Sequence, residues 1–147
     1  SRGEKRNIIE VNKINFSLRL LPLICYEIIY TGNISNNRDF DFIVNISEDG
    51  WFGESIGPHQ HFAHSIYRAI ESGKYVLRSA NNGIAAIVNP SGIVEKQVGL
   101  NQSGFIDLFE TKKIEPTIFS KYGNKIFLII ILMYIFLIFS FNKTKNE

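Results

Sequence analysis

The sequence predicts an α/β domain built on a mixed β-sheet and followed by an apolar helix. Short apolar segments alternate with a helical segment in the first half of the chain, which is the pattern of parallel strands joined by helices. A run of short strands separated by Gly-, Asn- and Pro-containing turns follows, which is typical of antiparallel pairing. The 147 residues are enough for one domain of ordinary size, or for part of one.

The first two strands lie in the N-terminal third of the chain. Residues 18–24 (LRLLPLI) form an apolar run that predicts a buried strand ending at Cys25. Pro22 within this run predicts a bulge or an edge position, because proline donates no hydrogen bond to a neighbouring strand. Residues 41–46 (DFIVNI) predict the second strand, and residues 27–37 between the two predict a short helix.

A helix and four more strands follow. The helix is expected from about Pro58 to Ser72, because proline favours the first turn of a helix and Gly73 provides a C-terminal stop. The pair Asn82-Gly83 predicts a hairpin turn. The strands are expected at residues 75–79, 84–89, 93–98 and 104–109.

The C-terminal segment differs from the rest of the chain. Residues 126–141 (IFLIIILMYIFLIFSF) contain neither a charge nor a proline, and they predict a transmembrane helix between a linker at 111–125 and a tail at 142–147. A helix of this length covers roughly 24 Å, and lysines that flank it bridge the remainder of a ~30 Å hydrocarbon core. A buried core helix is the alternative, but such a helix usually keeps a polar stripe.

The composition and the motifs exclude several kinds of function. The net charge of +2 is too small to indicate nucleic-acid binding. The single cysteine, Cys25, forms neither an internal disulfide nor a four-cysteine zinc site. The cluster of His59, His61 and His64 lacks further ligands at the spacing of a metal site, and the sequence has no glycine-rich phosphate-binding motif.

Cys25 is the candidate nucleophile. A residue at the end of a strand that enters a turn has a rigid backbone behind it and open space in front. An ordinary thiol, with a pKa of ~8.5, needs a base or a positive neighbour to react at neutral pH. Glu27 is two residues away and is a candidate partner. A pair with a histidine of the cluster is permitted by the spacing, but positions at the start of the helix and in a pocket wall are the favoured interpretation of these histidines. The alternative is an inert cysteine in an apolar core.

Five motifs occur in a fixed order along the chain. They are Leu23-Ile24-Cys25-Tyr26-Glu27, Glu48-Asp49-Gly50-Trp51-Phe52-Gly53, Gly57-Pro58-His59-Gln60-His61, Arg68-Ala69-Ile70-Glu71-Ser72-Gly73 and Arg78-Ser79-Ala80-Asn81-Asn82-Gly83. Thr117-Ile118-Phe119 and Tyr122-Gly123-Asn124 precede the apolar helix. Together, over residues 18–141, they resemble the apolipoprotein N-acyltransferases, the membrane-bound branch of the carbon-nitrogen hydrolase (nitrilase) superfamily. Glu48 departs from that pattern, because the family usually has asparagine there.

The resemblance implies a nitrilase-type α-β-β-α sandwich, of which residues 1–110 are the C-terminal part of the hydrolase domain. It also implies a Glu–Lys–Cys triad whose Glu and Lys precede the cysteine. The candidates upstream of Cys25 lie in no matching context: they are Glu4, Lys5, Glu10 and Lys13. We therefore expect the chain to be a fragment that is inactive alone, without the bundle of transmembrane helices that precedes the domain in the family.

The resemblance further implies an acyltransferase of lipoprotein maturation in the bacterial inner membrane, with its catalytic part facing the periplasm. Cys25 takes an acyl chain from a membrane phospholipid as a thioester, and the N-terminal amine of a diacylglyceryl-cysteine apolipoprotein accepts it. The backbone N–H of Tyr26 helps to form the oxyanion hole, and Glu27 supports the site. Neither a metal nor an organic cofactor is implied. The residues expected to bind substrate are Trp51, Phe52, Gln60, His61, Arg78 and Asn81.

Two of these expectations concern particular contacts. Trp51 and Phe52 on the glycine-flanked loop are expected to gate the entry of the acyl chain, with plain core packing as the alternative. Arg78 and Glu71 are expected either to form a structural pair or to support the site.

Two other functions remain open. One is an amidase or nitrilase that cleaves a small amide, with water accepting the acyl group; the apolar C-terminal helix and the Trp-Phe-Gly loop disfavour it. The other is a non-catalytic, membrane-anchored remnant of a split gene, which the missing upstream Glu and Lys favour.

Overall fold

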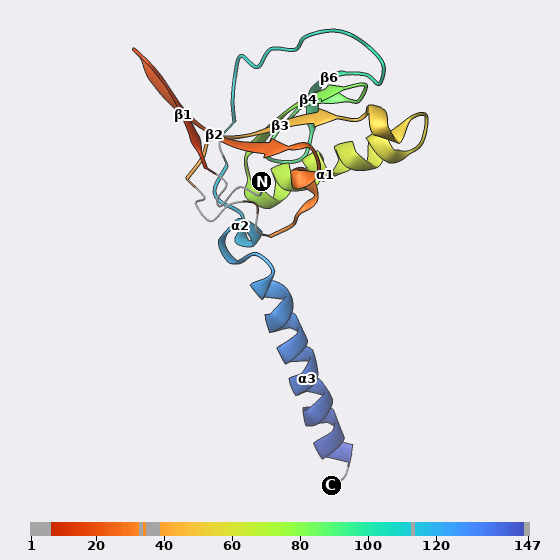
Figure 1. Cartoon of the computed structure of the whole chain (residues 1–147). Helices are drawn as coiled ribbons and strands as arrows, with labels where there is room; N and C mark the ends of the chain where they lie inside the picture. The colour runs from red at the N-terminus through yellow and green to blue at the C-terminus, as the bar shows by residue number, and fades with distance from the viewer. Residues whose placement is uncertain (1–6, 33, 35–38, 113, 146–147) are drawn as a thin grey trace.

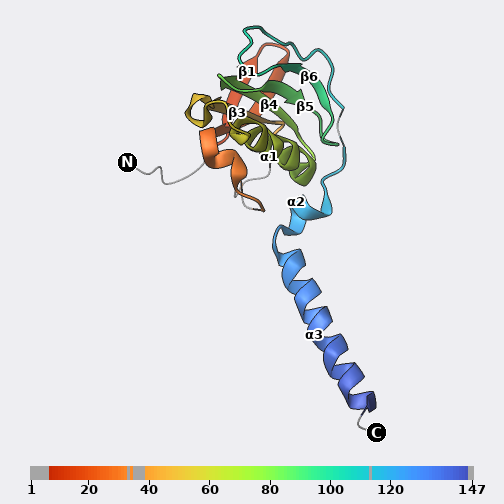
Figure 2. The same cartoon turned by 90° about the vertical axis from the view of Figure 1, so that its right-hand side faces the viewer.

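The computed structural model describes residues 7–32, 34, 39–112 and 114–145, without the side chains of residues 142–145. Within this part of the chain, six strands form one mixed sheet in the order β1-β2-β3-β4-β5-β6. Helix α1 covers one face of the sheet, and helix α3 projects away from it (Figure 1, and Figure 2 after a quarter turn). The described residues therefore build one sheet layer and one helix layer of the sandwich that the resemblance implies.

The sheet combines a parallel centre with antiparallel edges. β2, β3 and β4 are parallel, whereas β1 pairs antiparallel with β2, and β5 and β6 continue antiparallel from β4. The strands are β1 (Ile9–Lys13), β2 (Phe16–Ile24), β3 (Phe42–Glu48), β4 (Tyr75–Asn81), β5 (Ala85–Val88) and β6 (Val94–Val98). The helices are η1 (Cys25–Ile29), η2 (Gly50–Phe52), α1 (Gly57–Ser72), α2 (Ile118–Tyr122) and α3 (Lys125–Lys145).

The predictions from apolar runs and helix signals are confirmed for most elements. β2 to β6 overlap five of the six predicted strands, and α1 ends where Gly73 adopts a left-handed conformation with φ of 67°. Pro22 has the predicted edge character, because β1 pairs only with residues 16–20 of β2 and leaves Pro22 beside β3 alone among the described strands. Asn82, with φ of 52°, lies in the predicted hairpin between β4 and β5.

Three predictions of local structure are corrected. Residues 104–109 form no strand; this segment is held instead by single contacts, such as Lys96 Nζ donating to the Asp107 carbonyl at 2.8 Å. The helix expected over 27–37 is the short 3-10 helix η1, which begins at Cys25, and part of that range lies outside the described residues. β1 is a further strand that the sequence does not predict, because it has only two apolar residues, Ile9 and Val11, and four of its five residues are exposed.

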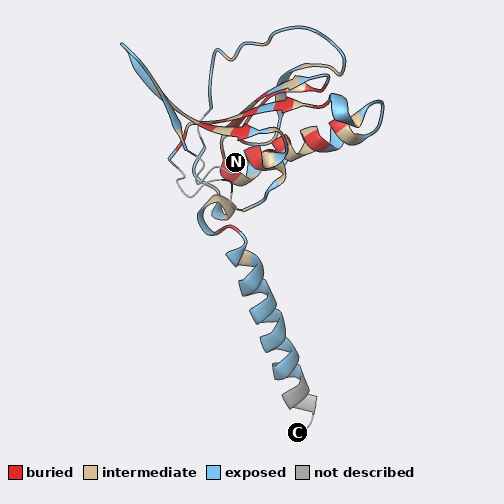
Figure 3. Cartoon of the chain, in the orientation of Figure 1, coloured by how far each residue is buried: buried red, intermediate tan, exposed pale blue. Residues whose placement is uncertain are grey.

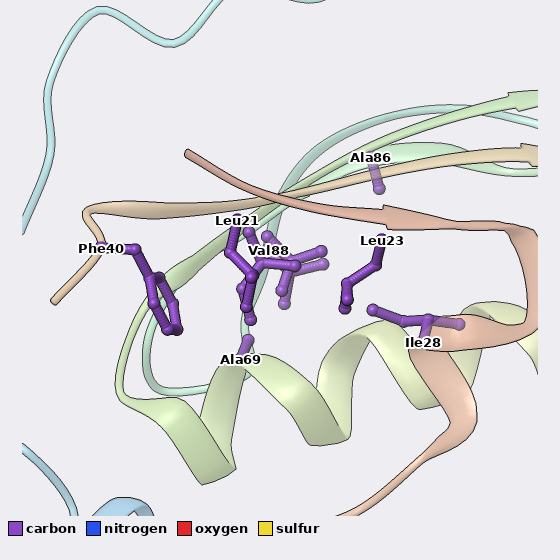
Figure 4. Close-up of a cluster of buried hydrophobic side chains, with 9 residues drawn as sticks. Leu21, Leu23, Ile28, Phe40, Ala69, Ala86 and Val88 are labelled. Atoms are coloured by element: carbon purple, nitrogen blue, oxygen red, sulfur yellow. The ribbon is translucent and has the colours of Figure 1, made fainter. Parts of the chain in front are cut away.

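The hydrophobic core lies between the sheet and α1. Figure 4 shows Leu21 and Leu23 of β2 on the side of the sheet that faces Ala69 of α1, with Ile28 of η1 beside them. The full cluster is Leu21, Leu23, Ile28, Phe40, Ile43, Ala69, Val76, Ala86 and Val88. Because side chains alternate along a strand, residues 43, 45 and 47 of β3 all point to this face.

The opposite face of the sheet is less covered. Residues 20, 22 and 24 of β2 and residues 42, 44 and 46 of β3 point that way, and each is half-buried or exposed. Ile24 and Ile46 at the carboxyl ends of these strands are 56% and 53% exposed. Figure 3 shows that burial is concentrated where α1 meets the sheet.

Residues 126–141 lie in the helix α3, as the sequence predicts for their secondary structure. Among the described residues, however, no helix combines the length and the apolar character needed to cross a membrane. The structure therefore does not support the transmembrane segment that the sequence predicts there.

Candidate active site

Cys25 lies at a sharp turn between β2 and η1, at the carboxyl end of the parallel strands. Its φ of 50° places a residue other than glycine in the left-handed region. Such a conformation costs about 1–3 kcal/mol and persists where the surrounding structure fixes it. The side chain is half-buried, so a small reagent can reach the sulfur. This is the arrangement that the end-of-strand prediction requires of a nucleophile.

Three side chains hold the backbone around Cys25. Asn45 Nδ2 donates to the carbonyl of Leu23 at 2.9 Å and to the carbonyl of Cys25 at 3.3 Å. On the other side of the turn, the Ile24 N–H donates to Glu27 Oε2 at 2.8 Å. The side chain of Glu27 thus clamps the backbone at the turn. His61 Nε2 adds a second contact to the Cys25 carbonyl, at 3.3 Å.

A buried network of five side chains lies beneath this turn, and we call it the Asp49 network: Asn45, Ser47, Asp49, His61 and Arg78. Asp49 is fully buried and is its centre. Asp49 Oδ1 accepts from the Ser47 hydroxyl at 2.7 Å and from His61 Nδ1 at 2.8 Å. Asp49 Oδ2 accepts from Arg78 Nη2 at 2.7 Å. Arg78 also donates to Asn45 Oδ1 and, at 3.1 Å, to the carbonyl of Ile84.

The charges in the network stabilise one another. Burial on its own would raise the pKa of Asp49, but the Ser47 hydrogen bond and the charge of Arg78 outweigh it and hold this pKa below its usual value. Burial lowers the pKa of Arg78, and the carboxylate of Asp49 opposes this change. The carboxylate of Asp49 only accepts hydrogen bonds, so the Nδ1 of His61 that contacts it carries a hydrogen.

Ser47 connects the network to the sulfur, and sequence reasoning missed it. Its Oγ lies 3.8 Å from Cys25 Sγ, within hydrogen-bond reach of sulfur, and 2.7 Å from Asp49 Oδ1. The available signal was the polar alternation at Asn45, Ser47 and Asp49 after an apolar start of the strand, which puts all three on one face.

A pocket of about 340 Å³, lined in part by aromatic rings, includes Tyr26, the residue that follows Cys25 in the chain. Tyr26 and Phe52 line it with ring centroids 6.2 Å apart, and the Tyr26 and His61 rings are 5.1 Å apart. Gln60 also lines this pocket, whereas Trp51 is 88% exposed and does not. The structure thus brings Phe52 and Gln60 to the pocket next to Cys25 and separates Trp51 from it.

Asn81 belongs to a second, polar hollow at the carboxyl end of β4. Asn81 Nδ2 donates to the Glu48 carboxylate, and Gly50 N–H donates to the same side chain at 2.7 Å. The hydrogen bond from Asn81, followed by that from Gly50, lowers the pKa of Glu48. The hollow, of about 420 Å³, is lined by Ser79, Asn81, Asn82, Gln102 and Ser103 among others.

One predicted pair and one alternative that the sequence left open are both absent from the described residues. Arg78 does not pair with Glu71: it binds Asp49, and Glu71 accepts from Arg68 Nη2 at 2.8 Å. His61 does not form a dyad with the thiol, because its two ring nitrogens contact Asp49 and the Cys25 carbonyl. His61 and Arg78 are buried, 2% and 3% exposed, and both contact Asp49.

The other titratable candidates lie away from the sulfur or outside the described residues. His59 is exposed on α1, and burial, followed by the charge of Arg68, lowers the pKa of the half-buried His64. Among the described residues, no cluster of His, Cys, Asp and Glu is arranged to hold a metal ion. Of the upstream candidates for the triad, Glu10 and Lys13 are exposed on β1, and Glu4 and Lys5 lie outside the described residues.

Comparison of the sequence with known proteins identifies the family that the chain matches. Residues 1–108 match the family described as carbon-nitrogen hydrolase. Proteins named apolipoprotein N-acyltransferase from Rickettsia bellii and Rickettsia prowazekii are 46% and 47% identical over 125 and 111 residues. These matches cover 84% and 74% of this chain but 25% and 22% of the relatives, so the chain spans about a quarter of their length.

A solved structure shares the fold. It is an amidase from Nesterenkonia sp. AN1, captured after Michael addition of acrylamide to its active-site cysteine. It matches 70% of this chain and 42% of its own chain with a TM-score of 0.51 and 16% identity. At this identity the likeness concerns the fold alone.

Proposed function

The chain belongs to the carbon-nitrogen hydrolase family, and from this premise we propose that it carries the nucleophile of an apolipoprotein N-acyltransferase. One observation carries the proposal: the half-buried Cys25 sits at a strained strand end that the Asp49 network fixes from beneath. The identity of 46–47% to relatives of that name supports acyl transfer as the proposed activity within the family.

The proposed reaction has two covalent steps. The Cys25 thiolate attacks the acyl ester carbonyl of a phospholipid, a carbon–sulfur bond forms, and the ester carbon–oxygen bond breaks to release a protonated lysophospholipid alcohol. The free amine of a diacylglyceryl-cysteine lipoprotein then attacks the thioester, forms an amide and returns the thiol. The Tyr26 N–H, the first amide after the nucleophile, is proposed to stabilise the oxyanion.

The general base is proposed to come from outside the described residues. Glu27 Oε2 accepts from the Ile24 N–H, and His61 contacts Asp49 and a carbonyl, so we assign to both a role in holding the turn rather than that of the base. The Glu and Lys of the family's triad would reach Cys25 from the part of the enzyme that covers the open face of the sheet, next to Ile24 and Ile46. That part would complete the four-layer sandwich.

The substrates are proposed to meet the chain at three places. Tyr26 and Phe52 in the aromatic pocket would contact the acyl chain. The polar hollow around Asn81 would receive polar groups of the donor or the acceptor. The exposed apolar side chains of α3 would attach the enzyme to lipid at the bacterial inner membrane, with Cys25 on the periplasmic side.

A reconstitution assay tests the proposal. The chain is mixed in detergent with the three quarters of the Rickettsia bellii relative that it does not match, and transfer from a labelled phospholipid to a diacylglyceryl-cysteine peptide is followed. We expect turnover from the mixture, none from this chain alone, and loss of turnover with Cys25→Ala or Cys25→Ser. Full turnover with Cys25→Ala contradicts the proposal, and release of free fatty acid without peptide acylation indicates a hydrolase instead.

A further inference from the structure

We propose that Ser47 is a positioning residue whose one hydroxyl hydrogen moves from Asp49 to the Cys25 sulfur when the thiol loses its proton. The inference rests on the proposed role of Cys25 as the nucleophile. According to this inference, the Asp49 network does more than hold the backbone. It also positions a hydrogen-bond donor for the thiolate.

The geometry of the thiol state follows from the two distances at Ser47 Oγ. A hydroxyl has a single hydrogen, and the carboxylate oxygen of Asp49 at 2.7 Å is a stronger acceptor than a thiol sulfur at 3.8 Å. Ser47 therefore donates to Asp49 while the sulfur is protonated. The S–H of Cys25 is then free to donate to a lone pair of Ser47 Oγ, which orients the thiol.

Asp49 can release the Ser47 hydrogen because two other donors hold its charge. His61 Nδ1 donates to Oδ1 at 2.8 Å, and Arg78 Nη2 donates to Oδ2 at 2.7 Å. Both oxygens thus keep a charge-assisted hydrogen bond after the hydroxyl rotates toward the sulfur. Rotation about one side-chain bond is the whole change, and no backbone movement is needed.

The charged groups around the sulfur determine how strongly the hydrogen of the Ser47 hydroxyl affects the stability of the thiolate. Glu27 faces the turn from η1, Asp49 follows β3, His61 lies on α1 and Arg78 on β4. Between Asp49 and the thiolate, Ser47 is the group whose hydrogen separates two negative charges. Without it, the thiolate faces the carboxylate directly and loses a donor, so a smaller fraction of Cys25 is ionised at neutral pH.

Alkylation of the thiol measures this effect directly, because Cys25 is the only cysteine of the chain. Iodoacetamide reacts with the thiolate: a carbon–sulfur bond forms, iodide leaves, and the buffer takes the thiol proton. The rate is followed by intact mass on the full chain in detergent from pH 6 to pH 10. We expect Ser47→Ala to react about three- to tenfold more slowly at pH 7, with its pH profile moved to higher pH.

Ser65→Ala is the matched control. Ser65 is also fully buried, and its Oγ has no hydrogen-bond partner among the described residues, so this variant removes a buried hydroxyl away from the sulfur. Its alkylation profile should equal that of the unchanged chain. Ser47→Thr keeps the hydroxyl and should restore the rate. If Ser47→Ala does not fold, as judged by its thermal melt, the isosteric pair Ser47→Thr and Ser47→Val makes the same comparison.

The inference is overturned if Ser47→Ala, or Ser47→Val against Ser47→Thr, leaves the rate and the pH profile unchanged, or if Ser65→Ala shifts them equally. This outcome is separable from the proposed function, since alkylation requires neither phospholipid nor acceptor. A Ser47 effect without acyl transfer contradicts only the proposed function. Acyl transfer without a Ser47 effect contradicts only this inference.

Discussion

Asp49 is the residue on which the site depends most for its stability. Its carboxylate is fully buried and binds Ser47, His61 and Arg78. Asp49→Asn removes the charge and leaves Arg78 as an unpaired buried cation, which should lower the free energy of unfolding by about 3–5 kcal/mol. Chemical denaturation in detergent measures the loss. Asp107→Asn, on the exposed segment after β6, is the control and should stay within about 0.5 kcal/mol.

The same residue predicts how stability depends on pH. The pKa of Asp49 in the folded chain lies below its unfolded value of about 3.9, because the Ser47 hydrogen bond and the Arg78 charge outweigh the cost of burial. Its contribution is therefore complete above about pH 5 and is lost as pH falls through the folded pKa. Unfolding measured from pH 6 to pH 2 should show a steeper acid loss for the unchanged chain than for Asp49→Asn. Equal slopes would contradict this assignment.

The backbone strain at Cys25 is testable by two substitutions that both remove the thiol. Glycine tolerates the φ of 50° that this position adopts, whereas alanine does not. Cys25→Gly should therefore be more stable than Cys25→Ala by about 1 kcal/mol, as measured by denaturant unfolding. If Cys25→Ala is the more stable variant, the backbone at this position carries no strain.

At the residue scale, the sequence predicts the turn at Cys25 better than it predicts the side chains that hold this turn. Cys25 is predictable because an apolar strand visibly ends there. The Asp49 network is not, because it depends on the register of β3 with β4, in which Asn45 and Arg78 are direct partners. Nothing local specifies that register, and the sequence therefore suggested Glu71 as the partner of Arg78.

At the scale of elements, the β4–β5 hairpin fixes the position of Asp49. Gly83 follows the turn, and a Cβ placed on it would overlap the Asp49 carboxylate. Gly83→Ala should therefore displace Asp49, destabilise the chain by about 1–3 kcal/mol and slow the alkylation of Cys25. Gly104→Ala is the control, because its Cβ would lie 3.3 Å from a Val98 methyl on an exposed segment. If Gly83→Ala and Gly104→Ala change stability and the alkylation rate equally, the close approach of Gly83 to the Asp49 carboxylate is unimportant.

Elements are predictable from the sequence where burial imposes a pattern. β2 and β3 bury one face against α1, so their apolar residues mark them, and Pro58 and Gly73 mark the ends of α1. β1 lies at the sheet edge with most residues exposed, and its two apolar residues, Ile9 and Val11, are too few to mark a strand. Residues 104–109 are mostly apolar but form no strand. Strand pairing is decided by tertiary contacts rather than by the local pattern.

At the scale of the whole molecule, α3 is the element proposed to attach the chain to lipid. Its side chains from Phe127 to Phe139 are apolar and exposed. The double variant Leu132→Glu and Phe136→Glu should reduce co-sedimentation with phospholipid vesicles several-fold, because buried charges oppose contact with hydrocarbon. Ile93→Glu, at an exposed apolar position on the sheet domain, is the control and should bind as before. Equal binding by all variants would contradict the role of α3.

The central claim is that Cys25 accepts an acyl chain, and trapping of the thioester tests it most directly. The chain, supplied with the remainder of the Rickettsia bellii relative, is incubated with a phospholipid of known acyl composition and no acceptor, and the peptide that contains Cys25 is analysed by mass spectrometry. The account predicts the mass of one acyl chain on that peptide, its removal by neutral hydroxylamine, and its absence in Cys25→Ala. The account would be contradicted by a different result: the acceptor, added later, becomes acylated although no acyl chain is ever found on Cys25.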